Sequence, residues 1–190
     1  MNAGSTLTVQ AGCELRFDSG AYLQVYGTLS APGTVGLPIL FTRRDVGETW
    51  NGLYIQAGGS GTMSYATVEY AASGGAGYGV YQNSSALALV NCTLRLNNYG
   101  LYASNANPQF LRCSITGNAQ YGVFLNGACL PVFGSDITEW NDIHGNGGAN
   151  PERDLRNGSE NIAARYVWWG VTSEAAVEGK IRHDPDDAAL

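Results

Sequence analysis

The sequence is poor in charge and contains almost no lysine. Charged residues make up 14% of the 190 residues, whereas about 25% is usual for a soluble domain. Lys180 is the single lysine, and acidic residues outnumber basic ones by 16 to 10, for a net charge of −6. Nucleic-acid binding requires clustered Lys and Arg, so this composition argues against a nucleic-acid partner.

Long apolar runs and paired cysteines are lacking as well. No run approaches the roughly 18 apolar residues of a membrane-spanning helix. The first residues show no basic segment followed by an apolar core, which a secretory signal would have. The four cysteines are Cys13, Cys92, Cys113 and Cys129. None forms a C-x-x-C pair, which excludes zinc-ribbon and thioredoxin-like sites, and four are too few for a disulfide scaffold in a chain of this length.

Glycine, in contrast, is abundant. The chain has 26 Gly together with 44% apolar residues, so it can form a real core interrupted by frequent turns. Few charges, many Gly and Asn, and plentiful aliphatic residues favour short buried strands over amphipathic helices.

An internal repeat organises the middle of the chain. Tyr78-Gly-Val-Tyr81 recurs as Tyr99-Gly-Leu-Tyr102 and as Tyr121-Gly-Val-Phe124, at spacings of 21 and 22 residues. A second block repeats with a shift of 21: Asn91-Cys-Thr-Leu94 followed by Asn97, and Arg112-Cys-Ser-Ile115 followed by Asn118. A unit of this length cannot bury its apolar side alone, so neighbouring units must stack.

The repeat unit predicts the fold. Its apolar residues alternate with period two, which indicates strands, and Gly, Asn and Ser interrupt them too often for helices. Propeller blades are about twice as long, and the leucine-rich pattern is absent. We therefore predict an all-β, right-handed parallel β-helix, a solenoid of about six to eight coils. We expect one domain over 1–190: N-terminal coils over 1–52, regular repeats over 53–146, and a C-terminal coil and cap over 147–190. Ser173 is expected to N-cap a short capping helix through Glu178, with Gly179 ending it.

Stacked coils place equivalent residues about 4.8 Å apart. Asn97 and Asn118 are then expected to form a ladder of side-chain amides that binds turn backbone groups. Cys92 and Cys113 are expected to stack inside the core, either as two buried thiols or as a disulfide, since bridged Cα atoms lie about 4.4–6.8 Å apart.

Six segments together have a familiar pattern: Leu7–Gly12, Gly20–Ala31, Pro38–Thr42, Trp50–Gly52, Val167-Trp-Trp-Gly170 and Ile181–Asp187. They resemble bacterial right-handed parallel β-helix repeat proteins of the pectin-lyase-like superfamily. Val167 stands where the family pattern usually has Asn, and the pattern runs on beyond Leu190. The resemblance implies the fold and a piece of a longer exported protein, secreted or on the cell surface. It does not imply one activity, because the superfamily includes lyases, hydrolases, adhesins and inert stalks.

The best-formed repeats contain no carboxylate. No acidic residue lies between Glu69 and Asp136, whereas glycoside hydrolysis needs two carboxylates facing one site. A lyase with an arginine base would need an acidic calcium cluster beside it. We therefore expect a non-catalytic module. The alternative is a polysaccharide lyase or glycoside hydrolase that uses Asp136, Glu139 and Asp142, around Trp140 and near His144. The same residues also fit a solvated turn in which Trp140 packs as core.

Aromatic residues suggest a binding surface. Tyr54, Tyr81, Tyr102 and Phe124 occupy equivalent repeat positions, preceded by Trp50, Tyr78, Tyr99 and Tyr121. In Tyr-Gly-Val-Tyr, strict alternation places the first Tyr on the side of Val and the second Tyr on the opposite side. With Val inward, Tyr54, Tyr81, Tyr102 and Phe124 form an exposed stripe that suits a glycan, unless loop geometry at the Gly reverses it. Trp140 is a further candidate platform for a sugar.

These observations define the expected function. We expect a rigid scaffold, or a polysaccharide-binding or adhesive segment, without a membrane span. No cofactor is expected, although Asp184, Asp186 and Asp187 could hold a calcium ion through oxygen ligands. Solenoids without a firm cap also tend to self-associate through their exposed coil ends.

Overall fold

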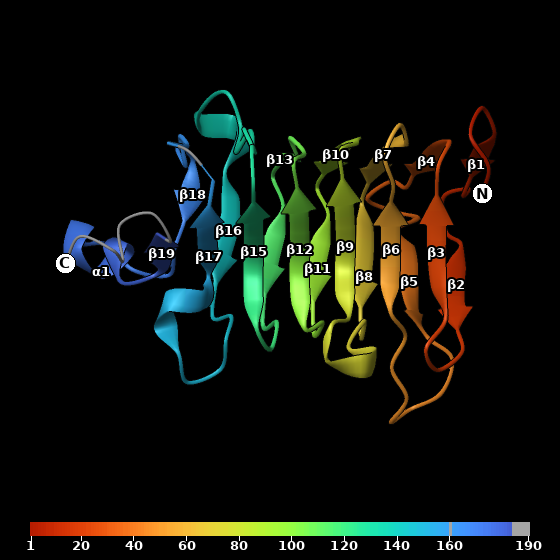
Figure 1. Ribbon diagram of the computed structural model, residues 1–190, viewed down its shortest axis with the longest axis horizontal. Helices are drawn as coiled ribbons and strands as arrows, with labels where there is room; N and C mark the ends of the chain where they lie inside the picture. Colours follow the sequence, from red (N-terminus) through yellow and green to blue (C-terminus); the bar gives the residue numbers. More distant parts are fainter. Residues whose placement is uncertain (160, 184–190) are drawn as a thin grey trace.

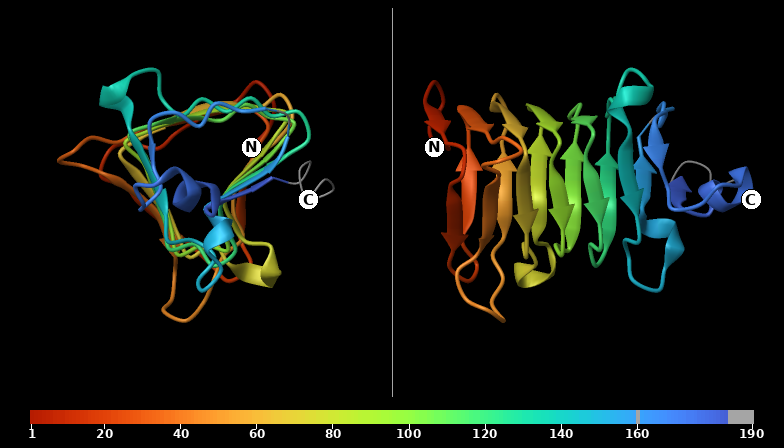
Figure 2. Two further views of the ribbon diagram at one scale, coloured as in Figure 1. Left: turned by 90° about the vertical axis from the view of Figure 1, so that its left-hand side faces the viewer. Right: turned by 180° about the vertical axis from the view of Figure 1, so that it is seen from behind.

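A computed structural model shows a stack of coils in which every strand pairs in parallel with its neighbours (Figure 1). The structure describes residues 1–159 and 161–183. Viewed along the stack, the coils superimpose as a triangle with one sheet on each side (Figure 2). The predicted parallel β-helix is confirmed, with about seven coils, because two of the sheets have seven strands and the third has five.

Each coil contributes one short strand to sheets B and C, and the first five coils also contribute one to sheet A. Sheet A consists of β1 (Thr6–Thr8), β4 (Thr28–Pro32), β7 (Ser60–Ser64), β10 (Ala86–Val90) and β13 (Gln109–Leu111). Sheet B consists of β2 (Glu14–Phe17), β5 (Ile39–Arg43), β8 (Ala66–Glu69), β11 (Thr93–Arg95), β14 (Ser114–Thr116), β16 (Asn141–His144) and β18 (Val167–Trp168). Sheet C consists of β3 (Tyr22–Val25), β6 (Gly52–Ile55), β9 (Tyr78–Asn83), β12 (Tyr99–Ser104), β15 (Tyr121–Asn126), β17 (Leu155–Gly158) and β19 (Ile181–His183).

Among the described residues, helical structure is confined to the loops and to the segment before β19. Three single 3₁₀ turns lie outside the coils: η1 (Ser73–Gly75), η2 (Ile137–Glu139) and η3 (Pro151–Arg153). The only α-helix among the described residues is α1 (Glu174–Glu178). As predicted, the Ser173 side chain accepts a hydrogen bond from the Ala176 amide and Gly179 ends the helix. No helix in the described part of the chain is long and apolar enough to span a membrane.

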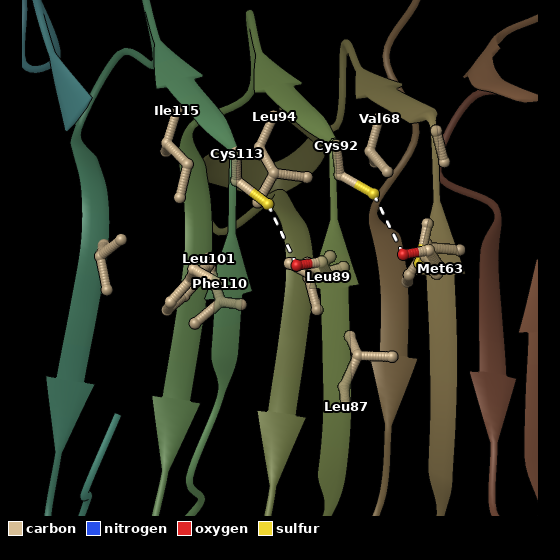
Figure 3. Packing of buried hydrophobic residues seen from close by; sticks show 14 of the residues in the cluster. Met63, Val68, Leu87, Leu89, Cys92, Leu94, Leu101, Phe110, Cys113 and Ile115 are labelled. Atoms are coloured by element: carbon tan, nitrogen blue, oxygen red, sulfur yellow. Dashed lines mark hydrogen bonds between the residues drawn. The ribbon is translucent and has the colours of Figure 1, made fainter. Parts of the chain in front are cut away.

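The interior of the triangle is an apolar core with stacked thiols. The cysteines of the repeat are buried and free, so the thiol alternative holds rather than the disulfide. The Sγ of Cys92 donates to the Met63 carbonyl at 3.4 Å, and the Sγ of Cys113 to the Leu89 carbonyl at 3.2 Å (Figure 3). Burial raises the pKa of the Cys113 thiol and keeps it protonated.

The predicted asparagine ladder is present at the corner between sheets B and C. The Oδ1 of Asn118 accepts from both the backbone amide and the Nδ2 of Asn97, each at 3.1 Å. Asn118 in turn donates through Nδ2 to the Oδ1 of Asn146 at 2.9 Å. Every Nδ2 also donates to a backbone carbonyl of the preceding coil. The ladder therefore supplies partners for buried backbone groups that the turn would leave unpaired.

The ladder ends on a buried carboxylate. The Oδ1 of Asp154 accepts from the backbone amide and the Nδ2 of Asn146, both at 2.9 Å. Asp154 is 1% exposed, and its second oxygen lies 3.7 Å from the Nζ of Lys180, the single lysine. Burial raises the pKa of Asp154 despite the hydrogen bonds from Asn146 and the charge of Lys180.

This raised pKa predicts a pH dependence of stability. Above the ordinary pKa of 3.8, the unfolded chain loses its proton before the folded chain does, so the contribution of Asp154 to stability falls as pH rises through the folded pKa. We expect the unfolding free energy of wild type minus that of Asp154→Asn to decrease as the pH rises above about 4. Urea unfolding at several pH values measures it. A difference that does not change with pH for Asp154→Asn contradicts the assignment.

Candidate functional site

The outer side of sheet C carries an aromatic surface that extends over five coils. Its members, which we call the aromatic face, are Tyr22, Tyr54, Tyr78, Tyr81, Tyr99, Tyr102, Tyr121 and Phe124. Ring contacts connect all eight, with centroids 4.7–6.1 Å apart. Strand register arranges them in columns, because equivalent residues of successive coils pair directly.

Two columns run side by side. One column contains Tyr22, Gly52, Tyr78, Tyr99 and Tyr121 in register. The other contains Gln24, Tyr54, Tyr81, Tyr102, Phe124, Arg156 and Arg182. The register thus groups the predicted candidates Tyr54, Tyr81, Tyr102 and Phe124 on one face. The expectation that Trp50 belongs to the first column is wrong, because Gly52 fills that position and Trp50 is buried against Phe17.

The side predicted for the first tyrosine of the repeat is also wrong. Tyr78 contacts Tyr81 and Tyr102, with centroids 5.2 and 5.1 Å apart, so it lies on the outside with them. The cause is a register shift opposite Gly79, which inserts an extra residue as in a β-bulge. A Cβ on Gly79 would lie 2.7 Å from the Nδ2 of Asn97. Glycine is therefore required where the strand passes the ladder, and both tyrosines of the unit point outward.

The rings of the second column stand upright and stack on one another. Tyr81 and Tyr102 have centroids 5.5 Å apart and planes 22° from parallel. Tyr102 and Phe124 are 4.7 Å apart at 11°. Nearly parallel rings at these separations cannot lie side by side in one plane, so they face each other along the axis in the stacked geometry that aromatic pairs prefer. Consequently the outer edges of the rings, rather than their faces, meet the solvent.

The phenolic hydroxyls form the outer edge of this surface. Tyr78, Tyr81, Tyr99 and Tyr102 are all half-buried. The described part of the chain offers none of these hydroxyls a hydrogen-bond partner, and none is a buried unsatisfied atom. Partial burial raises the pKa of Tyr78 to about 12 and also raises those of Tyr54 and Tyr102. The hydroxyls of Tyr54, Tyr78 and Tyr102 are therefore neutral, and a phenolic hydroxyl can both donate and accept hydrogen bonds with a ligand.

Arginine side chains cover the C-terminal end of the aromatic face. The guanidinium of Arg156 lies 4.3 Å from the ring centroid of Phe124, and that of Arg153 lies 5.5 Å from Tyr121. These are cation–π distances. Phe124 and Tyr121 are accordingly only 8% and 6% exposed, so the accessible part of the face extends from Tyr22 to Tyr102.

Trp140 does not join the other candidates. It follows η2 and precedes β16 on sheet B, away from sheet C, and it is 47% exposed. The structure therefore separates it from the aromatic face, and its predicted contact with a sugar remains a prediction.

Two of the three acidic residues of the catalytic alternative, Asp136 and Glu139, accept hydrogen bonds from their own turn. The Oδ1 of Asp136 accepts from the amide and hydroxyl of Thr138 at 2.7 and 2.6 Å, which lowers its pKa. Glu139 accepts from the amide and hydroxyl of Ser135. A general acid of a glycosidase needs a raised pKa, so the environment of Asp136 opposes that role. Asp142 lies on β16 with its Oδ1 3.1 Å from the Nε2 of His144.

Sequence reasoning did not identify Glu69 as the buried charged residue of sheet B. Glu69, 7% exposed, accepts from the Thr42 hydroxyl at 3.1 Å and from the Nε of Arg95 at 2.9 Å. Arg95 is one coil further along the same outer column. Glu69 and Arg95 are 26 residues apart rather than one repeat length, because the coil between them contains the insertion that includes η1. The repeat therefore did not predict that they pair. The pair is satisfied internally and packs as part of sheet B.

Sheet A contains a shallow hollow of about 260 Å³. It is lined by Thr28, Ser60, Gly61, Thr62, Ala86, Leu87, Ala88, Asn107 and Gln109. None of these residues has an ionisable side chain, so the hollow offers hydrogen bonds but no acid, base or nucleophile pair.

The described residues contain no cluster of side chains that could hold a metal ion. Within 1–159 and 161–183, no three His, Cys, Asp or Glu side chains gather as a metal site would require. The calcium candidates Asp184, Asp186 and Asp187 lie outside the described residues.

The coils, the three parallel sheets and the asparagine ladder define a β-solenoid of the parallel β-helix class. The family model for the right-handed beta helix region matches residues 34–150. The chain therefore belongs to the right-handed β-helix family. No curated protein and no solved structure matches it.

Proposed function

We propose that this chain is a non-catalytic β-helix module of a secreted or cell-surface protein that binds a polysaccharide along the aromatic face. The observation that carries the proposal is the in-register grouping of eight aromatic side chains on the outside of one sheet. Aromatic side chains that serve only to fill the core do not need to repeat on the outer side of a sheet. An exposed, contiguous apolar surface of this kind typically marks an interaction site.

The rigidity of the fold supports a binding role. Each coil is held to the next by backbone hydrogen bonds and a continuous apolar core, and the asparagine ladder also links the coils that contain Asn97, Asn118 and Asn146. A rigid surface binds without a large loss of conformational entropy. The same rigidity suits a scaffold, and the two roles are compatible in one module.

Removing two central rings is expected to abolish binding. We predict that Tyr81→Ala combined with Tyr102→Ala weakens retention in native gels containing the bound polysaccharide by at least about tenfold in apparent Kd. Circular dichroism checks the fold. Tyr65→Ala, at the corner between β7 and β8, is the matched control and should leave retention unchanged. Equal retention of the double variant, with its fold intact, contradicts binding at this face.

The enzymatic alternative makes a different prediction. A lyase or hydrolase releases unsaturated products or new reducing ends from the polysaccharide, whereas the proposed module releases neither. Product release that disappears in Asp136→Ala and Glu139→Ala would replace the proposal by catalysis at η2.

A further inference from the structure

We infer that the ligand of the aromatic face is an uncharged, extended, linear polysaccharide that runs along the helix axis and is held by tyrosine hydroxyls. The inference rests on the proposed function and specifies the class of glycan and the mode of contact. Its first support is the stacking of the second column. Tyr102 has Tyr81 on one side and Phe124 on the other. A sugar cannot stack on a ring face that a neighbouring ring already covers, so contact occurs at the hydroxyl edge.

A polar column borders the aromatic columns and repeats in the same register. Asn83 pairs with Ser104, and Ser104 pairs with Asn126. These residues follow the outward tyrosines by two positions and therefore point to the same side. Along β9 and β12 the face thus presents aromatic edges beside amide and hydroxyl groups, and Asn126 on β15 continues the polar row. Such groups can donate and accept hydrogen bonds with the hydroxyls of a sugar.

The spacing of this surface favours a polymer over a single sugar. The same set of two tyrosines and a polar group occurs on β9 and β12, and Tyr54 and Tyr22 continue the aromatic surface over the two preceding coils, with neighbouring coils about 4.8 Å apart. A ligand whose own units repeat on a similar length can form equivalent contacts with several coils at once. Once one unit is bound, the next binds intramolecularly, so affinity should increase with chain length until the accessible coils are filled. A monosaccharide or a compact branched glycan can use only one coil.

Over the accessible part of the aromatic face, from Tyr22 to Tyr102, the charge distribution favours an uncharged polymer, because Arg153 and Arg156 lie beyond it over Tyr121 and Phe124. The outer columns of β6, β9, β12 and β15 contain no Asp, Glu, Lys, Arg or His. Arg95 and Arg112 are the only charged residues between 70 and 135. Arg95 lies on sheet B, paired with Glu69, and Arg112 donates to Asn91 between β13 and β14. Recognition by neutral hydrogen bonds should be insensitive to salt, whereas an acidic polymer would require counter-charges and lose affinity at high ionic strength.

The test compares neutral and acidic polysaccharides on the same protein. Gels containing hydroxyethyl cellulose, xylan or laminarin represent neutral polymers, and polygalacturonate or alginate represents acidic ones. We expect retention by a neutral polymer that does not change between about 0.05 M and about 0.5 M NaCl. In calorimetry with oligosaccharides of the retained polymer, from dimer to octamer, we expect affinity to increase with length.

Hydroxyl removal tests the mode of contact. Tyr81→Phe and Tyr102→Phe keep the stacked rings and remove only the oxygens, so each should weaken binding by about three- to tenfold. Tyr65→Phe is the matched control and should have no effect. Unchanged affinity of the Phe variants, or a dimer that binds as tightly as the octamer, overturns the inference. Salt-sensitive retention by acidic polymers alone overturns it but leaves the proposed function intact. Retention by no polymer at all overturns both.

Discussion

Replacing Asn118 by alanine is expected to lower the free energy of unfolding by about 3–5 kcal/mol. The Asn118 side chain binds two donors of Asn97 through Oδ1. It also donates to the Leu94 carbonyl at 3.1 Å and to the Oδ1 of Asn146 at 2.9 Å. Alanine leaves these groups buried without partners, and each unsatisfied buried group costs about 1–3 kcal/mol. Urea unfolding followed by circular dichroism measures the loss.

A neighbouring asparagine provides the control. Asn98 is half-buried and donates once through Nδ2, to the Ala72 carbonyl at 3.3 Å. Asn98→Ala should therefore cost about 1 kcal/mol or less. If the two alanine variants lose equal stability, the ladder does not carry the energetic role that its hydrogen bonds indicate.

Gly100→Ala is expected to cost about 3 kcal/mol. A Cβ at this position would lie 2.5 Å from the Gly122 carbonyl oxygen, 2.6 Å from Ile115 Cγ2 and 2.9 Å from Asn118 Nδ2. The coil spacing and the ladder must both shift to accommodate it. For a chain of this size, the loss corresponds to a fall in Tm of roughly 6–12 °C, which differential scanning calorimetry measures.

A substitution at a glycine with free space around it distinguishes this steric effect from the general effect of replacing glycine by alanine. Gly36 has no atom within 4 Å of an added Cβ and no positive φ. Gly36→Ala should be neutral or slightly stabilising, because alanine restricts the unfolded chain. A Tm for Gly100→Ala within a degree or so of wild type would show that the coils separate more easily than the packing suggests.

The repeats made much of the fold predictable. Tyr78, Tyr99 and Tyr121 recur at nearly constant spacing, and this period fixed the stacking of coils and the register of sheet C. Asn97 and Asn118 recur with it, so their ladder was predictable once strands were known to stack at about 4.8 Å.

The parts that sequence missed depend on departures from regular geometry. The bulge at Gly79 places Tyr78 outside, whereas strict alternation places it inside. The end of the ladder was hidden because Asp154 lies only 8 residues after Asn146, not one repeat later. The pairing of Glu69 with Arg95 was hidden because an irregular loop changes the spacing of that coil. The sequence repeat predicts none of these features, because each lies where the repeat is irregular.

Nuclear magnetic resonance of tyrosine rings tests the central claim most directly. In protein with isotope-labelled tyrosine rings, titration with the octamer of the retained neutral polymer should shift the signals of Tyr81 and Tyr102. The signals of Tyr65, at the corner between β7 and β8, and of Tyr70, which follows β8 and lies under the Arg43 guanidinium, should not move. Shifts confined to Tyr65 and Tyr70, or no shift at all at saturating ligand, would contradict binding along the aromatic face.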